Sequence, residues 1–175
     1  MAGIVYNLLQ GHSGTAGINV GGNDYHGNAR TTTDLVDFRN GAVVGNILAT
    51  AAALGKRVFI QITCDGATGS AVSTQVSDPS GDRGVGGAQI WIAYDPAGRP
   101  NISGNQLGNM TASQGADSSS IIGSDASRAS LYGFRNYLQF ANAKTAQTIF
   151  NTVIPANTTN DIDAPTLAQV LKFQG

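Results

Sequence analysis

Hydrophobic residues recur at helical spacing between residues 34 and 54. The positions that form this apolar face are Val36, Val43, Ile47, Ala51 and Leu54. Val44 and Leu48 widen the face, and Asn40 interrupts it. Spacings of three and four residues are typical of an amphipathic helix. Asp34 is a suitable N-cap, and Gly55 is suited to end the helix. Asp37 would lie in the first turn, where the partial positive charge of the helix N-terminus favours an acidic residue. We therefore expect a helix over 34–54 with one buried face.

Two short runs rich in β-branched and aromatic residues predict strands over 58–63 and 89–94. The first follows the predicted helix after Gly55 and ends on the acidic loop Cys64-Asp65-Gly66. The second closes on Asp95-Pro96-Ala97-Gly98, a typical turn sequence. A helix, a glycine and a strand in succession indicate a sheet with helices on its faces. The expected fold is thus α/β, with helices packed on a mostly parallel sheet and long loops rich in Gly, Ser and Asn.

Further helices are predicted in the second half of the chain and at its start. One spans about 125–142, and the residues expected on its inner face are Leu131, Phe134, Leu138 and Ala141. Others are expected over 1–10, over 144–153 and from about Asp163, where Leu167, Val170 and Leu171 would point inward. Ile18 and Val20 could form a short strand, and 64–87 is expected to be a long polar loop. Length favours one domain over 1–175, but so few strands also suit a fragment or half of a larger domain.

Composition adds a preference for assembly. Charged residues are only 12% of the chain, about half the usual share, whereas hydrophobic residues are 41% and glycines number 23. Little self-repulsion favours close packing between subunits, so we expect a homo-oligomer or a larger protein assembly. A net charge of −1 without a basic cluster argues against nucleic acid as a partner. No stretch approaches the ~20 apolar residues of a membrane span.

A surface rich in Asn, Thr, Ser and Gly favours an extracytoplasmic location, meaning periplasmic, secreted or on the cell surface. Residues 1–6 have neither the basic start nor the long apolar core of a signal peptide. A signal would then lie outside this chain, and a cytoplasmic location stays open. The single cysteine, Cys64, excludes an intrachain disulfide and leaves the redox compartment undetermined.

The order of several motifs resembles the C-terminal half of the DUF1501 family, which is similar to the sulfatases and alkaline phosphatases. The motifs are Gly22-Asn23-Asp24-Tyr25-His26, the helix over 34–54, the strand into Asp65-Gly66, and Ser77-Asp78 followed by Asp82-Arg83-Gly84. The resemblance covers about residues 20–95. It implies an alkaline-phosphatase-like partial domain and, if the protein is active, a metal-dependent hydrolase of phosphate or sulfate esters.

By that resemblance, Asp24, His26, Asp65 and Asp82 would be ligands of a divalent metal, Zn, Mn, Mg or Ca. Asp and His are ligands that such metals accept, and a metal neutralises an ester's charge and activates a nucleophile. Two departures weaken this implication. Arg83 stands where the family has a His, and a guanidinium cannot bind a metal, although it could hold an anion or pair with a carboxylate. The family's nucleophile lies in an N-terminal half that this sequence lacks.

Three functions therefore stay open. The leading hypothesis is a phosphatase- or sulfatase-like domain of doubtful catalytic competence that serves as a surface or extracytoplasmic structural protein. The second is the metal-dependent hydrolase. The third is a binding module that presents the loop over 64–87, where Asp78, Ser80 and Asp82 alternate like calcium ligands but lack the closing Glu of a calcium loop.

Overall fold

The structure is a computed structural model of the 175-residue chain. The residues that it describes are 2–25, 29–63, 68–70, 79–82, 88–109, 111–112, 117–121, 126–154 and 168–174.

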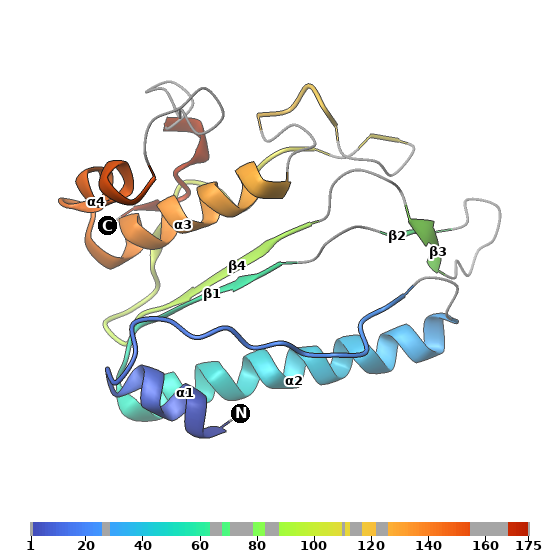
Figure 1. Ribbon diagram of the computed structural model, residues 1–175, viewed down its shortest axis with the longest axis horizontal. Helices are drawn as coiled ribbons and strands as arrows, with labels where there is room; N and C mark the ends of the chain where they lie inside the picture. Colours follow the sequence, from blue (N-terminus) through green and yellow to red (C-terminus); the bar gives the residue numbers. More distant parts are fainter. Residues whose placement is uncertain are drawn as a thin grey trace. The chain divides into compact units, whose positions relative to one another are not determined.

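Helices and strands are both present, so the fold is of mixed α/β composition (Figure 1). The helices are α1 Ala2–Leu9, α2 Arg30–Leu54, α3 Ala126–Asn142 and α4 Ala146–Val153. The strands are β1 Val58–Ile62, β2 Thr68–Ser70, β3 Pro79–Asp82, β4 Ile90–Tyr94, β5 Asn101–Ile102 and β6 Phe173–Gln174. None of the described helices has the length and apolarity needed to cross a membrane.

The described strands form two-stranded pairs, β1 with β4, β2 with β3 and β5 with β6. The last two pairs are antiparallel, and β1 and β4 run in opposite directions in Figure 1. The described strands thus show no parallel sheet, contrary to the expectation from the helix–strand step. The reason lies in the connection, because a parallel pair needs a long crossover, usually a helix. Between β1 and β4 the described residues are the strands of a hairpin instead.

Contacts divide the chain into two compact units. Unit 1 comprises Met1–Val58, Thr68–Asp82 and Tyr94–Gly98. Unit 2 comprises Phe59–Ala67, Arg83–Ala93 and Arg99–Gly175.

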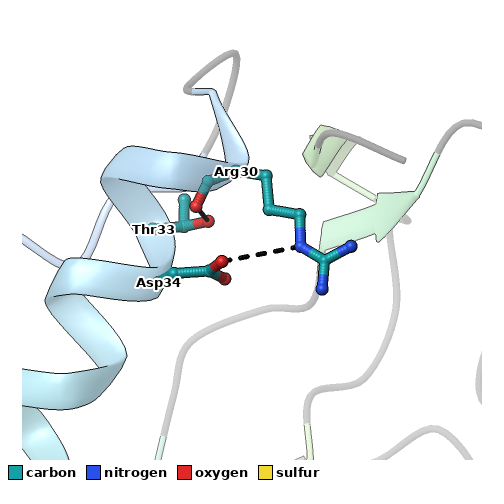
Figure 2. A network of polar contacts seen from close by, with 3 residues as sticks. All are labelled: Arg30, Thr33 and Asp34. Atoms are coloured by element: carbon teal, nitrogen blue, oxygen red, sulfur yellow. Dashed lines mark hydrogen bonds and ion pairs between the residues drawn. The ribbon is translucent and has the colours of Figure 1, made fainter. Parts of the chain in front are cut away.

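In unit 1, α2 begins four residues before the predicted start. Its N-cap is Ala29, whose side chain makes no capping hydrogen bond, so the predicted cap at Asp34 is wrong. Asp34 lies inside the first turns, where its carboxylate is 3.6 Å from the guanidinium of Arg30 (Figure 2). The hydroxyl of Thr33 donates to the carbonyl of Arg30 at 2.9 Å. The Arg30–Asp34 pair is exposed and contributes only a few tenths of a kcal/mol, so α2 depends mainly on packing.

The inner face of α2 is the predicted one. Ala51 is buried, and the remaining predicted positions are half-buried, namely Val36, Val43, Val44, Ile47, Leu48 and Leu54. The predicted N-terminal helix is α1, which packs against α2 and buries Val5 and Leu9. The strand expected at Ile18–Val20 is absent, and this segment belongs instead to an irregular stretch over 15–25.

Gly55 ends α2 as predicted. Its backbone is left-handed, with φ 60° and ψ 37°, and its N–H reaches the carbonyls of Ala51 and Ala52. We expect Gly55→Ala to lower the free energy of unfolding by about 1 kcal/mol, because a Cβ is strained in this conformation. Gly55→Asn should cost less, since asparagine tolerates it better. Urea unfolding of the three proteins would show this order; equal stabilities would contradict it.

Unit 2 is organised around α3, with α4 packed against it through Leu138, Ala146 and Phe150. Phe59 of β1 joins an aromatic cluster, with ring centroids 5.8 Å from Tyr137 and 5.4 Å from Phe173. Because these contacts reach α3 from more than one direction, the helix is buried on more than the single face that was predicted. The buried residues of α3 are Ala129, Tyr132, Gly133, Arg135, Asn136, Leu138 and Phe140.

Three of the four inward residues predicted for this helix are at least half-buried, namely Leu131, Phe134 and Leu138. The fourth, Ala141, is exposed, so that prediction is wrong. It lies at the end of α3, where the chain turns into α4. The helix predicted over 144–153 is confirmed as α4, and Val170 of the last predicted helix is fully buried. The start expected near Asp163, with Leu167, lies outside the described residues.

The side chain of Asn136 ties α3 to the end of the chain. It is fully buried, and its amide nitrogen donates to the carbonyls of Tyr132 at 2.8 Å and Val170 at 2.9 Å. Its oxygen accepts the N–H groups of Lys172 at 2.7 Å and Phe173 at 3.2 Å. The segment so held continues into β6, which pairs with β5. One side chain therefore bonds four backbone groups, three of which, those of Val170, Lys172 and Phe173, lie outside α3.

The stretch over 64–87, predicted as one polar loop, contains a hairpin. Strands β2 and β3 pair antiparallel, with Thr68 opposite Asp82, Gly69 opposite Ser80 and a register shift between Thr68 and Gly69. Its strands are short and rich in Gly, Ser and Pro, which explains why composition predicted a loop.

Candidate functional site

The candidate metal ligands are only partly described. Asp24 is an exposed residue of the irregular segment before α2, and Asp82 is the last residue of β3. His26 and Asp65 lie outside the described residues, as do Arg83 and Asp78 of the predicted anion site and interaction loop. Ser80 pairs with Gly69 through its backbone in β3. Within the described ranges, no group of three or more His, Cys, Asp or Glu side chains could hold a metal ion.

The segment that carries Asp24 is fixed to α2 by side-chain hydrogen bonds. The guanidinium of Arg39 donates to the carbonyl of Gly21 at 2.7 Å. The amide nitrogen of Asn40 donates to the side-chain oxygen of Asn23 at 2.8 Å. Asn40 interrupts the apolar inner face of α2, and this contact explains the interruption. Neutral amides and one arginine therefore hold the first part of the motif that suggested a metal loop.

Tyr25 adds a second link, since its hydroxyl donates to the carboxylate of Asp37. Burial is the main reason that the pKa of Tyr25 rises to about 12, and the hydrogen bond and negative charge of Asp37 add to it. Asn40 and the positive charge of Arg39 act in the opposite direction. The phenol thus stays protonated near neutral pH and acts as a hydrogen-bond donor, so it is suited to positioning the loop and unsuited to acting as a base.

This raised pKa predicts a titration. The unfolded chain would lose the Tyr25 proton near pH 10, its ordinary value, and the folded chain near pH 12. The contribution of the protonated Tyr25 to the free energy of unfolding is therefore complete below pH 10 and is lost as the pH rises toward 12. Absorbance at 295 nm should show one tyrosine ionising near pH 12, and Tyr25→Phe should remove that component. An unchanged high-pH component in Tyr25→Phe would contradict the assignment.

A second feature of α2 is its outer face, opposite the inner one. At alternating spacings of three and four residues it presents exposed apolar or small residues, namely Leu35, Phe38, Ala42, Gly45, Ala49 and Ala52. We call this set the outer stripe. Leu35 is 71% exposed and Phe38 79% exposed, which are the largest values among the exposed large hydrophobic residues described. No charged residue stands between Arg39 and Lys56, so α2 is apolar or neutral on every side along this stretch.

Two glycines lie on this exposed side, within the helix. Apart from the neighbouring backbone of α2 itself, a Cβ added at Gly41 or Gly45 would meet no atom of the described residues within 4 Å. Glycine in a helix interior costs about 1 kcal/mol relative to alanine. Nothing in the described parts of the chain requires a glycine at either position, so no contact described within the subunit offsets this cost.

Sequence reasoning found the inner face of α2 but missed the outer stripe and the polar links of the Asp24 segment. Two signals were available. The polar residue Asn40 within an apolar face marks a side chain with a specific partner, and the charge-free run from Arg39 to Lys56 marks a helix without a polar outer side. Comparison of the sequence and structure with family models, curated proteins and solved structures finds no match.

Proposed function

We propose that this protein is a structural subunit of a protein assembly and that its contacts with partners are made through the outer stripe of α2. The observation that carries the proposal is the exposure of Leu35 and Phe38, which begin a stripe that continues along the charge-free run between Arg39 and Lys56. From Asn40 to Leu54 the helix carries no charge on any side, and surface helices of water-soluble proteins normally present charged or polar residues on their outer face. Contiguous exposed apolar positions on a water-soluble surface mark interaction sites.

The rest of the surface supports the same function. Only 12% of residues are charged, so subunits repel one another little. The irregular segment before α2 is held by Arg39 and Asn40, which are not members of the stripe. Assembly requires no chemistry from Asp24 or Tyr25, and the hydrogen bond from Tyr25 to Asp37 of α2 then has a structural purpose.

Location and ancestry belong to the same proposal. We place the protein outside the cytoplasm, at a surface or in an extracytoplasmic assembly, because its composition replaces Lys and Glu with Asn, Thr, Ser and Gly. The motif order supports descent from an alkaline-phosphatase-like domain that has lost catalytic parts. Arg83 in place of the family's metal-binding His supports that loss.

Sedimentation velocity over a wide range of concentrations tests the proposal. The monomer mass is 17.9 kDa, and we expect species of at least twice that mass to become dominant as concentration rises. The association should persist in 0.5 M salt, because apolar contacts are not screened. A compact monomer at every concentration would overturn the proposal.

The hydrolase is the second candidate, and one observation favours it. The Asp24 segment is held by ordered polar contacts instead of hanging free, as a ligand-bearing loop requires. Calorimetric titration with Zn²⁺, Mn²⁺, Mg²⁺ and Ca²⁺, and assays with aryl phosphate and aryl sulfate esters, test this function. Metal binding and turnover that both vanish in Asp24→Ala would support it. Equal behaviour of Asp24→Ala and the parent would dismiss it.

The third candidate is a binding module that uses the segment over 64–87. The β2–β3 hairpin gives that segment a defined element that could present a ligand-contacting edge. Replacing residues 71–78 by a short Gly-Ser linker should then abolish partner capture while the fold is kept. Unchanged capture would exclude this function.

A further inference from the structure

We infer that the partner on the outer stripe is α2 of a second copy of this chain, packed antiparallel to it about a two-fold axis. The inference rests on the proposed function and specifies its partner and geometry. The arrangement pairs Leu35 with Ala52, Phe38 with Ala49 and Ala42 with Gly45, each pair formed by one residue from either copy. The two-fold axis then passes between positions 42 and 45, near the middle of the helix.

Side-chain size along the stripe carries this geometry. The large residues, Leu35 and Phe38, lie toward the N-terminal end, and Ala49 and Ala52 lie toward the C-terminal end. An antiparallel pair sets every large side chain of one copy against a small one of the other. Two copies of the same surface are then self-complementary, as a two-fold interface requires. The alternating spacing of three and four keeps all six positions on one seam.

The glycines supply an independent reason for a close partner. Gly41 and Gly45 reduce helix stability, and within the described part of the chain nothing outside the helix's own neighbouring backbone lies within 4 Å of where their Cβ atoms would be. Small residues at a helix–helix interface allow the two backbones to approach closely. In the antiparallel arrangement both glycines lie beside the two-fold axis, where the helices come nearest. The space that is empty in one chain is thereby filled by the other.

Charge complementarity agrees with the antiparallel direction. Asp34 and Asp37 lie near the N-terminal end of the stripe, and Lys56 follows its C-terminal end. In the antiparallel pair Asp34 lies level with Ala53 of the partner helix, so the partner's Lys56, which follows the end of that helix at Leu54 by two residues, lies at the same end of the interface. Symmetry repeats this pair at the other end. Opposed helix dipoles add to the preference.

A parallel pair would lack these features. It would set Leu35 and Phe38 against the same residues of the partner and leave alanine against alanine further along. The helices would be held apart at one end while the small residues lost contact at the other. It would also bring like charges together, Asp34 to Asp34 and Lys56 to Lys56. The stripe therefore distinguishes the two directions.

Disulfide cross-linking of two single-cysteine proteins tests the geometry. In a Cys64→Ser background, one protein carries Leu35→Cys and the other Ala52→Cys. We expect oxidation of the mixture to give the mixed disulfide dimer, since facing positions of closely packed helices fall within disulfide reach. Each protein oxidised alone should stay largely unlinked, because identical positions are about 26 Å apart along the axis (17 residues at about 1.5 Å each). Efficient linkage of either protein alone would overturn the inference in favour of a parallel pair.

The failure of this inference is separable from the failure of the proposed function. The Cys64→Ser background is sedimented first. If it associates but the mixture gives no 35–52 disulfide, the antiparallel pairing is wrong and the assembly function stands. If it is monomeric, both are wrong.

A second variant keeps the test independent of cysteine chemistry. Gly45→Leu inserts a bulky group beside the proposed axis, where the single chain has open space. It should weaken dimerisation at least roughly 100-fold, in the range of a residue central to an interface. Helix content by circular dichroism should be kept, since leucine is a better helix former than glycine. Unweakened dimerisation of Gly45→Leu would contradict the close approach.

Discussion

Replacing Asn136 with alanine is expected to lower the free energy of unfolding by about 3–5 kcal/mol, more than any substitution considered at another position. The variant would leave the carbonyl of Val170 and the N–H groups of Lys172 and Phe173 without their present partners. An unpaired buried polar group costs about 1–3 kcal/mol, and the lost side chain also leaves a cavity. Urea unfolding monitored by circular dichroism measures the change.

Two further substitutions make this result specific. Asn136→Asp keeps the shape but removes both N–H donors and brings a negative charge to the carbonyl of Val170, so we expect a loss at least as large as that of alanine. Asn151→Ala is the matched control, because this asparagine lies on α4 and is exposed. It accepts one hydrogen bond from Gln147, and its loss should cost about 0.5 kcal/mol or less. Equal costs at 136 and 151 would contradict the role of Asn136.

The second large effect concerns association. The double variant Leu35→Glu/Phe38→Glu is expected to be monomeric, with a dissociation constant at least about a thousandfold higher than that of the parent. Each interface would have to bury four carboxylates against alanines, and unpaired buried charges cost several kcal/mol. Because both positions are exposed in the single chain, the free energy of unfolding should change by only about 0.5 kcal/mol. Sedimentation velocity and urea unfolding, run together, separate these two quantities.

The matched control is Ile149→Glu/Val153→Glu on α4. These positions are also apolar and exposed, at 41% and 56%, and lie one helical turn apart. The control adds the same two charges away from the outer stripe, so association should be unchanged apart from a small salt-dependent effect. If the control disrupts association as strongly as the α2 variant, the stripe is not the contact surface.

The helices and two main strands follow from local chemistry, which is why they were predictable. The inner face of α2 depends on the spacing of its apolar residues, and the end of α2 depends on the left-handed conformation that Gly55 adopts easily. The strand over 58–62 follows from its β-branched and aromatic residues. Each of these features is determined by residues that lie close together in the sequence.

Features that depend on distant residues were not predictable in the same way. Strand direction depends on how 63–89 connects β1 to β4, which composition does not reveal. The start of α2 differs from the prediction because Ala29, without a capping side chain, precedes it and packing decides the boundary. Asn136 sits within a helix and hydrogen-bonds residues 34 to 37 positions away. Ala141 matched the apolar spacing but lies where α3 ends.

The candidate site shows the same division. The sequence motif directed attention to the segment around Asp24, but the attachment of that segment to α2 through Arg39, Asn40 and Asp37 depends on the three-dimensional arrangement. The metal set of Asp24, His26, Asp65 and Asp82 stays a prediction. The outer stripe could be read from the sequence only once the inner face was known, because both faces of α2 are apolar.

Radical footprinting of Leu35 and Phe38 tests the central claim most directly. Hydroxyl radicals modify exposed side chains, and mass spectrometry reads the extent at each residue in dilute and in concentrated protein. The proposed assembly predicts that modification of both residues falls several-fold at high concentration, whereas Ile149 and Val153 stay equally reactive. Equal modification of Leu35 and Phe38 at both concentrations would contradict the claim that α2 is the assembly surface.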